Sequence, residues 1–450
     1  LVGIGDGQTI FQEGIFEKHI FYSANLKSEE SSKHQAYNAE QIKNALLSAI
    51  QNSGPVHINV PFNEPLYETE ESSKIAVPEY IASGVNEIQS DSQIKRFRDL
   101  WYGAKRKMIL VGVLPPNSFD ESLLKKLAED KSLVVFTETT SNLSSESFFP
   151  SIDKIIAPLD HQGFEDLQPE FLLTFGGMVI SKKIKAFLRK YQPKEHWHIG
   201  PLGANDTFFA LTEHVKSKPN SFLKKAFNGS RNLPDSNYQN LWLKVKRHRE
   251  KGHENYMNVI PFSDLLAFYL MLNYFPKYVK VQMGNSSAIR YAQLFNWHPS
   301  IQMFCNRGTS GIDGSTSTAI GAAVVSEKPT IFVTGDLSFF YDSNALWNNY
   351  IPNNFKIILI NNGGGGIFRI LPGHKNTENF DRYFETKHHL IAKQLCEMYG
   401  FNYITAMDRT ELEVALSLFF ENNDQPILLE IFTPSRMNDE ILLQYFEHIK

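Results

Sequence analysis

The sequence predicts an α/β fold made of consecutive open parallel sheets with helices on both faces. Short, almost uniformly apolar runs such as Met108–Val113 and Thr330–Thr334 alternate with longer segments of helical periodicity. Strands that are buried on both faces of a parallel sheet have this composition. The alternation occurs in two separate regions of a 450-residue chain, which is too long for one ordinary core. We therefore expect more than one sheet domain.

The alternation divides the chain into three expected domains, residues 1–70, 78–255 and 259–450. The first contains a helical stretch over residues 36–50 and the short strand Val56–Val60, and a polar linker follows it. Residues 215–258 are rich in Lys, Asn, Ser and His, which predicts a surface helix. The remaining strand candidates are Leu133–Phe136, Phe171–Phe175, Trp197–Ile199, Val279–Met283, Gln302–Phe304, Lys356–Ile360 and Ile427–Ile431.

Composition argues against several classes of function. A net charge of −4 leaves no basic excess to neutralise phosphates, so nucleic acid is not an expected partner. No apolar run reaches the length of a membrane span or forms a signal peptide. The two cysteines, Cys305 and Cys396, give neither a disulfide framework nor a zinc spacing. We expect a cytoplasmic protein without a membrane partner.

Two polar motifs follow two consecutive strand candidates. Gly335-Asp336 follows Thr330–Thr334, and Asn361-Asn362 follows Lys356–Ile360, with a helical segment expected over Ser343–Tyr350. A right-handed crossover brings both motifs to one edge of a parallel sheet, where α/β proteins bind ligands. Carboxylate, amide and backbone oxygens favour a hard cation such as Mg²⁺, which shares its coordination with phosphate and water. The pair predicts a site for a metal ion and a diphosphate ligand.

A glycine run, Gly363–Gly366, extends the second motif and allows backbone and ligand to approach closely. It is not a P-loop, because no Gly-Lys-Ser/Thr follows it. Each motif alone is more often an ordinary turn or loop. Their occurrence together, at strand ends one crossover apart, favours a ligand site.

Gly-Asp followed one crossover later by Asn-Asn resembles the signature of thiamine-diphosphate enzymes. Among these, the chain is similar over nearly its whole length to the 2-succinyl-5-enolpyruvyl-6-hydroxy-3-cyclohexene-1-carboxylate synthases of menaquinone biosynthesis. The similarity is strongest in Met283–Arg290 (MGNSSAIR), Asn306–Gly314 (NRGTSGIDG), Gly335–Asn344 (GDLSFFYDSN) and Asn361–Pro372. It implies a thiamine-diphosphate-binding fold. Residues 1–70 would be the C-terminal part of the pyrimidine-binding domain, 78–255 the central α/β domain, and 259–450 the domain that binds diphosphate and Mg²⁺.

The resemblance also implies roles for individual residues at the cofactor. Asp336 and Asn362 would bind Mg²⁺ (or Mn²⁺) through side-chain oxygens, and Gly364 through its carbonyl. Ile312 would be the apolar wedge that holds thiamine diphosphate bent, beside an apolar wall formed by Ile367, Phe368 and Leu371. Many relatives have a third Asn where this chain has Gly363, a change expected to loosen the loop without removing a ligand.

The implied reaction decarboxylates 2-oxoglutarate and adds the resulting succinyl-semialdehyde carbanion to isochorismate, which makes the protein a transferase. Both substrates are dianions, so their pocket needs fixed positive charges, and Arg is suited to carboxylates. By similarity the substrate-binding residues are Gln8, Lys182, Lys183, Ser286, Arg290 and Arg307. From the residues alone, the lysine pair would be solvated surface, and Arg290 could equally be a salt-bridge residue.

The resemblance assigns no catalytic residue within the chain. The family's glutamate, which contacts the aminopyrimidine ring, is expected upstream of residue 1, and Glu13 and Glu17 match a later family segment. The cofactor site of these enzymes lies between subunits, so a homodimer or homotetramer is expected. Two alternatives remain. One is another thiamine-diphosphate decarboxylase or carboligase of the acetolactate-synthase type, and the other is a non-catalytic fragment that only binds the cofactor.

Overall fold

The structure is a computed structural model that describes residues 2–5, 7, 9–29, 31–62, 67, 69, 90–229, 231–370, 377–421 and 424–450. The chain divides into two compact units, one formed by Leu1–Ile88 with Pro201–Gly203 and the other by Gln89–Gly200 with Ala204–Lys450. Among the described residues, no helix is both long and apolar enough to cross a membrane.

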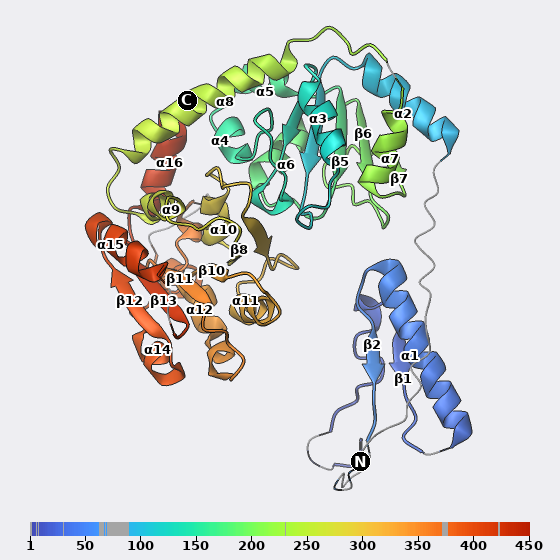
Figure 1. Cartoon of the computed structure of the whole chain (residues 1–450), viewed down its shortest axis with the longest axis vertical. Coiled ribbons are helices and arrows are strands. Elements are labelled where there is room, and N and C mark those ends of the chain that lie inside the picture. Colours follow the sequence, from blue (N-terminus) through green and yellow to red (C-terminus); the bar gives the residue numbers. More distant parts are fainter. Residues whose placement is uncertain are drawn as a thin grey trace. The chain divides into compact units, whose positions relative to one another are not determined.

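The first unit contains a strand–helix–strand motif (Figure 1). Strands β1 (Ser23–Asn25) and β2 (His57–Asn59) pair in parallel, and α1 (Ser32–Asn52) connects them. The short helix η1 (Glu17–His19) precedes β1. The side chain of Ser31 caps α1 by accepting a hydrogen bond from the backbone N of His34. The predicted helix over 36–50 and the strand near residue 58 are both confirmed, and β1 was not predicted.

The first sheet of the second unit is parallel, with strand order β4-β3-β5-β6-β7. Successive residues of β3 point to opposite faces. Ile109 and Val111 therefore join a core with α2, α3 and α7, whereas Met108 and Leu110 join a core with α4, α6 and α8. The elements are α2 (Asp91–Gly103), β3 (Lys107–Val111), α3 (Glu121–Glu129), β4 (Leu133–Phe136), η2 (Thr139–Ser141), α4 (Ile152–Ile156), α5 (His161–Leu167), β5 (Phe171–Phe175), α6 (Lys182–Lys190), β6 (Glu195–Ile199), β7 (Glu213–Val215), α7 (Pro219–Ala226) and α8 (Tyr238–Met257).

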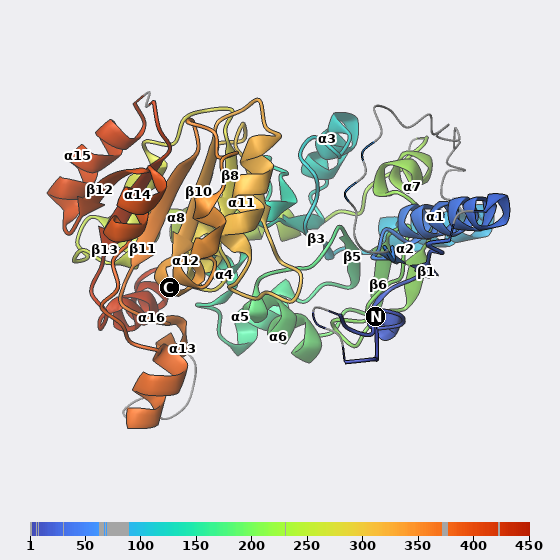
Figure 2. The same ribbon diagram turned by 90° about the horizontal axis from the view of Figure 1, so that it is seen from below.

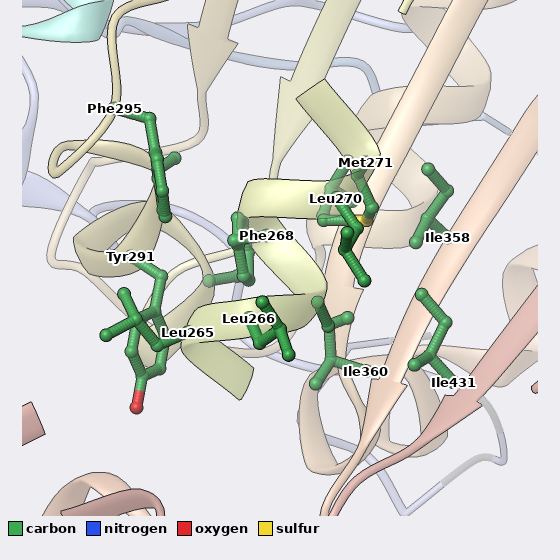
Figure 3. Packing of buried hydrophobic residues seen from close by; sticks show 14 of the residues in the cluster. Leu265, Leu266, Phe268, Leu270, Met271, Tyr291, Phe295, Ile358, Ile360 and Ile431 are labelled. Atoms are coloured by element: carbon green, nitrogen blue, oxygen red, sulfur yellow. The ribbon is translucent and has the colours of Figure 1, made fainter. Parts of the chain in front are cut away.

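The second sheet is also parallel, with strand order β12-β13-β11-β10-β8-β9 (Figure 2). Ile358 and Ile360 of β11 face a core with α9, α10, α15 and α16, and Figure 3 shows α9 side chains packed toward these residues and Ile431. Ile357 and Leu359 face α11, α12 and α14. The elements are α9 (Asp264–Leu272), β8 (Lys280–Met283), α10 (Ser287–Ala292), β9 (Gln302–Cys305), α11 (Ser315–Val324), β10 (Thr330–Gly335), α12 (Asp336–Tyr341), η3 (Ser343–Trp347), β11 (Lys356–Asn361), α13 (Ile367–Ile370), η4 (Phe380–Glu385), α14 (Lys393–Tyr399), β12 (Asn402–Ala406), α15 (Arg409–Phe419), β13 (Ile427–Phe432) and α16 (Asn438–His448).

Helix α8 and the side chain of Asn142 provide two of the connections between the sheets of the second unit. Helix α8 packs against β4 and α4 of the first sheet and against α16 of the second. Its Trp242 and Tyr256 are buried whereas Leu241 is exposed, so the predicted surface helix buries one face in the core. At the second connection, the Asn142 side chain accepts a hydrogen bond from the backbone N of Met303 (2.8 Å) and donates one to the carbonyl of Met303 (3.0 Å). The Asn142 amide thereby pairs with edge strand β9 as another strand would.

The predicted α/β class, with parallel sheets and helices on both faces, is confirmed. Each strand candidate in the second unit coincides with a strand to within two residues. The helix expected over Ser343–Tyr350 is the main difference, because α12 already begins at Asp336 and only a short 3-10 turn, η3, covers Ser343–Trp347. This places Asp336 at a helix start, directly after its strand.

Candidate active site

Asp336 and the glycine loop meet at the carboxyl edge of the second sheet. The Asp336 side chain is 3% exposed. Its Oδ1 accepts a hydrogen bond from the backbone N of Leu337 (2.7 Å), and its Oδ2 accepts one from the backbone N of Gly364 (2.9 Å), in the loop after β11. His388 Nε2 lies 3.3 Å from Asp336 Oδ2. The two sequence motifs are therefore in direct contact, as the crossover argument predicts.

Asn362 lies in the same loop and has a buried acidic neighbour. Its Nδ2 donates a hydrogen bond to Asp264 Oδ2 (3.0 Å), which leaves Oδ1 outside this contact. Asp264 begins α9 and is 2% exposed, and burial raises its pKa to about 6. No motif in the sequence marks Asp264.

The backbone of Gly364 requires glycine. Its φ is +150°, and a Cβ would lie 2.6 Å from the carbonyl oxygen of Glu385. The Gly364 carbonyl accepts one hydrogen bond, from the backbone N of Gly366 (3.0 Å), and a carbonyl oxygen has a second lone pair. This oxygen can therefore accept a further ligand.

The oxygen donors at this edge fit a hard cation. Within the described ranges, no group of three or more His, Cys, Asp or Glu side chains is placed to hold a metal ion. The donors present are instead the carboxylate of Asp336, the free amide oxygen of Asn362 and the carbonyl of Gly364. Such a mixed set suits Mg²⁺ or Mn²⁺ when phosphate and water complete the coordination shell.

A cavity of about 640 Å³ is lined by α13, which directly follows the glycine loop, and by helices and loops that flank the two sheets of the second unit. It brings together most of the sequence-predicted substrate and cofactor residues. Gln8 and Leu371 lie outside the described residues. The predicted residues that line the cavity are Lys182, Lys183, Ser286, Arg290, Arg307, Ile312, Ile367 and Phe368.

The cavity is cationic. Besides the predicted cations it contains Lys185, one helical turn after Lys182, and the carboxyl group of Asp153. Burial lowers the pKa of Arg290 and of Lys185, and burial raises the pKa of Asp153. The Asp153 carboxyl accepts a hydrogen bond from Ser181 Oγ, the cap of α6. The surplus of positive charge suits ligands with two carboxylates.

Asn285 holds Arg307 at the cavity wall. Its Oδ1 accepts a hydrogen bond from Arg307 Nη1 (2.7 Å), while its Nδ2 donates to the carbonyls of Asn306 and Gly311 (both 2.6 Å). Arg307 Nε is buried and has no hydrogen-bond partner among the described residues. The neighbouring Ser286 has a φ of +67°, and strained backbone of this kind concentrates at functional sites.

Several residues around the site were not predicted from the sequence. Lys185 could have been found, because its spacing from Lys182 places both on one helix face. Asp153, Asp264 and Glu138 could not, because each belongs to an element far away in sequence. Glu138 is 2% exposed and accepts hydrogen bonds from the backbone N of Ile180 and Ser181, directly before α6.

Comparisons with known proteins agree with this geometry. Residues 283–431 match the family model described as thiamine pyrophosphate enzyme, C-terminal TPP binding domain. The fold and site thus define a thiamine-diphosphate-dependent enzyme.

The chain is also similar to curated proteins named 2-succinyl-5-enolpyruvyl-6-hydroxy-3-cyclohexene-1-carboxylate synthase. It is 51% identical over 448 residues to that of Flavobacterium psychrophilum, with 100% of this chain and 80% of the relative covered. Identity is 49% over 468 residues with that of Christiangramia forsetii, with 100% and 81% covered. It is 36% over 461 residues with that of Porphyromonas gingivalis, with 99% and 78% covered. The chain belongs to the 2-succinyl-5-enolpyruvyl-6-hydroxy-3-cyclohexene-1-carboxylate synthase family.

Proposed function

We propose that this enzyme decarboxylates 2-oxoglutarate and joins the remaining four-carbon unit to isochorismate, a transferase reaction that depends on thiamine diphosphate and Mg²⁺ (or Mn²⁺). The observation that carries the proposal is the cationic cavity next to the glycine loop. Pyruvate, with one carboxylate, would not need so many cations, and this favours a dicarboxylate donor.

The chain's own residues fall into two groups, those that would hold the metal ion and those that would bind and enclose the substrates. Asp336, Asn362 and Gly364 would hold the metal ion. When bound, thiamine diphosphate supplies the carbon nucleophile that decarboxylation of a 2-oxo acid requires.

Arg290, Arg307, Lys182 and Lys183 would bind the carboxylates of the two substrates, with Ser286 as a further hydrogen-bonding group. Lys183 Nζ lies 5.0 Å from the centre of the Phe446 ring, which keeps this ammonium at the cavity. Ile312, Ile367 and Phe368 would form an apolar wall that excludes water from the reacting carbon.

We further propose that the enzyme acts as a homodimer or homotetramer. The assembly follows the resemblance to enzymes whose cofactor lies between subunits. Size-exclusion chromatography with light scattering would test it, and a monomer in the presence of cofactor would contradict it.

The reaction is tested by the loss of isochorismate absorbance in the presence of 2-oxoglutarate, thiamine diphosphate and Mg²⁺, omitting each component in turn. Loss that requires all components supports the proposal. Faster loss with pyruvate than with 2-oxoglutarate would favour an acetolactate-synthase type of activity. Metal-dependent binding of thiamine diphosphate without any loss would favour a cofactor-binding protein that lacks turnover.

A further inference from the structure

We propose that Asp264 is a positioning residue that orients the side-chain amide of Asn362 so that its oxygen faces the metal ion. The proposal rests on the proposed metal role of Asn362. It adds a residue that carries no motif and lies outside the loop that binds the ion.

The two ends of the Asn362 side-chain amide differ in what they can bind. An Asn side chain presents an oxygen on one side and an NH₂ group on the other, and rotation by half a turn exchanges them. Only the oxygen can bind a cation. Asp264 Oδ2 accepts a hydrogen bond from Asn362 Nδ2 at 3.0 Å. Because a carboxylate accepts hydrogen bonds but does not donate them, this contact selects the orientation that leaves Oδ1 for the ion.

Asp264 is itself held from two further directions. Its Oδ1 accepts a hydrogen bond from Thr433 Oγ1 (2.5 Å), directly after β13, and its backbone N donates to Asn438 Oδ1 (2.9 Å) at the start of α16. The two carboxylate oxygens therefore have separate partners. At 2% exposure the side chain has little room to rotate.

Helix α9, which begins with Asp264, packs against strand β11, which directly precedes the loop with Asn362. Residues of α9, including Leu266 and Leu270, pack in one core with Ile358 and Ile360 of β11, the strand that ends just before Asn362 (Figure 3). A shift of α9 relative to β11 would disturb this close-packed core. The distance between Asp264 and Asn362 is thus set by packing as well as by the hydrogen bond.

The other possible role of Asp264 is structural, because an acidic residue in the first turn stabilises a helix. T433V is a matched control for that role, since it removes one hydrogen bond of Asp264 but leaves the contact with Asn362. The double variant D264N/N362D is a second control. It restores an amide–carboxylate pair in the reverse order, so that a carboxylate oxygen at position 362 is again free for the ion.

The experiment measures binding of Mn²⁺ to the full chain with saturating thiamine diphosphate, from the decrease of the free-ion electron paramagnetic resonance signal. Loss of a residue that orients a metal ligand typically weakens metal affinity by about 10- to 100-fold. We expect this loss for D264L, which has a similar shape but offers no acceptor to Asn362, a change below about threefold for T433V, and recovery in D264N/N362D relative to N362D. Thermal unfolding shows whether each variant is folded.

The outcomes separate the two proposals. Wild-type protein that binds no Mn²⁺ with thiamine diphosphate would overturn the proposed function, and the role of Asp264 with it. Wild-type binding together with unchanged affinity in D264L would overturn only the role of Asp264. Should D264L fail to fold, the folded double variant D264N/N362D decides, because failure to bind Mn²⁺ there would contradict the proposal.

Discussion

Gly363 and Gly364 are neighbours whose surroundings leave different room for a side chain. A Cβ on Gly364 would collide with the carbonyl of Glu385, and its φ of +150° disfavours other residues. Gly363 has a φ of +77°, and a Cβ there would be 3.4 Å from the closest atom, the carbonyl oxygen of His388. Asn tolerates this left-handed conformation better than other residues with a side chain.

We therefore expect G364A to lower the free energy of unfolding by about 1–3 kcal/mol and to weaken binding of the metal ion and cofactor. G363N, which restores the Asn of many relatives, should change stability by less than about 0.5 kcal/mol. Denaturant unfolding and calorimetric titration with Mg²⁺ and thiamine diphosphate measure both. Equal losses in the two variants would contradict the difference in backbone geometry.

Arg307 is expected to depend on its planar guanidinium and not only on its charge. R307K keeps the charge but loses both the hydrogen bond to Asn285 and the buried Nε. The KM of at least one substrate should rise about tenfold or more, with little change in the thermal midpoint. Steady-state kinetics with each substrate varied would measure this. R231K is the matched control, because Arg231 pairs with Asp99 at the surface, and an equal effect there would contradict the assignment.

At the residue scale, sequence reasoning found the groups that motifs mark. Asp336 and Asn362 follow neighbouring strands, so the contact between the aspartate and the loop that contains Asn362 could be derived from topology alone. Asp264 and Asp153 could not be found, because their proximity to the site results from packing between elements distant in sequence. The roles assigned to Gln8 and Leu371 remain predictions.

At the element scale, every central strand of the second unit was predicted, and of its edge strands β4 and β9 were predicted but β7 and β12 were not. β10 and β11 are almost entirely buried and mainly apolar, whereas β12 is largely half-exposed and β7 has one buried residue. The apolar pattern that predicts a strand is weak in these two edge strands, whereas edge strand β4 is buried throughout. The buried face of α8 was not predicted, because it includes polar residues such as Gln239 and His253.

Glu138 ties the start of α6 to the end of β4, and its burial makes this link sensitive to pH. Burial raises its pKa to about 7, against 4.5 for an ordinary Glu. Between these values the folded protein holds a proton that the unfolded chain has released, so stability falls as pH rises from 4.5 to 7. The contribution of Glu138 to this fall is on the order of 3 kcal/mol.

E138Q has no carboxyl group to titrate at this position, so its free energy of unfolding should lack the part of the pH dependence that Glu138 contributes. The lost hydrogen bond changes the free energy of unfolding by an amount that does not depend on pH. Urea unfolding of both proteins across this pH range measures the difference. Parallel curves for E138Q and the wild type would show that Glu138 is not the titrating group.

At the scale of the whole second unit, Asn142 connects the two sheets. Its φ of +49° is left-handed, so N142G removes the side chain without straining the backbone. We expect N142G to lower the free energy of unfolding by about 1–3 kcal/mol, because Met303 loses both hydrogen bonds at a part-buried site. N142D keeps one acceptor and should lie between N142G and the wild type. Denaturant unfolding measures these differences in the free energy of unfolding. An N142G variant as stable as the wild type would contradict the role of Asn142 as a connection between the sheets.

The cavity draws its cations from elements that flank both sheets. Lys182, Lys183 and Lys185 lie on α6 beside the first sheet, and Arg290 and Arg307 lie on α10 and after β9 in the second. Their mutual repulsion opposes docking of the sheets, and a bound dianion would cancel it. Substrate would then act as a folding ligand for the unit as well as a reactant. A dicarboxylate at 100 times its dissociation constant would add about 2.7 kcal/mol to stability. In the cell, the lifetime of the folded enzyme would thus depend on the supply of its own substrates.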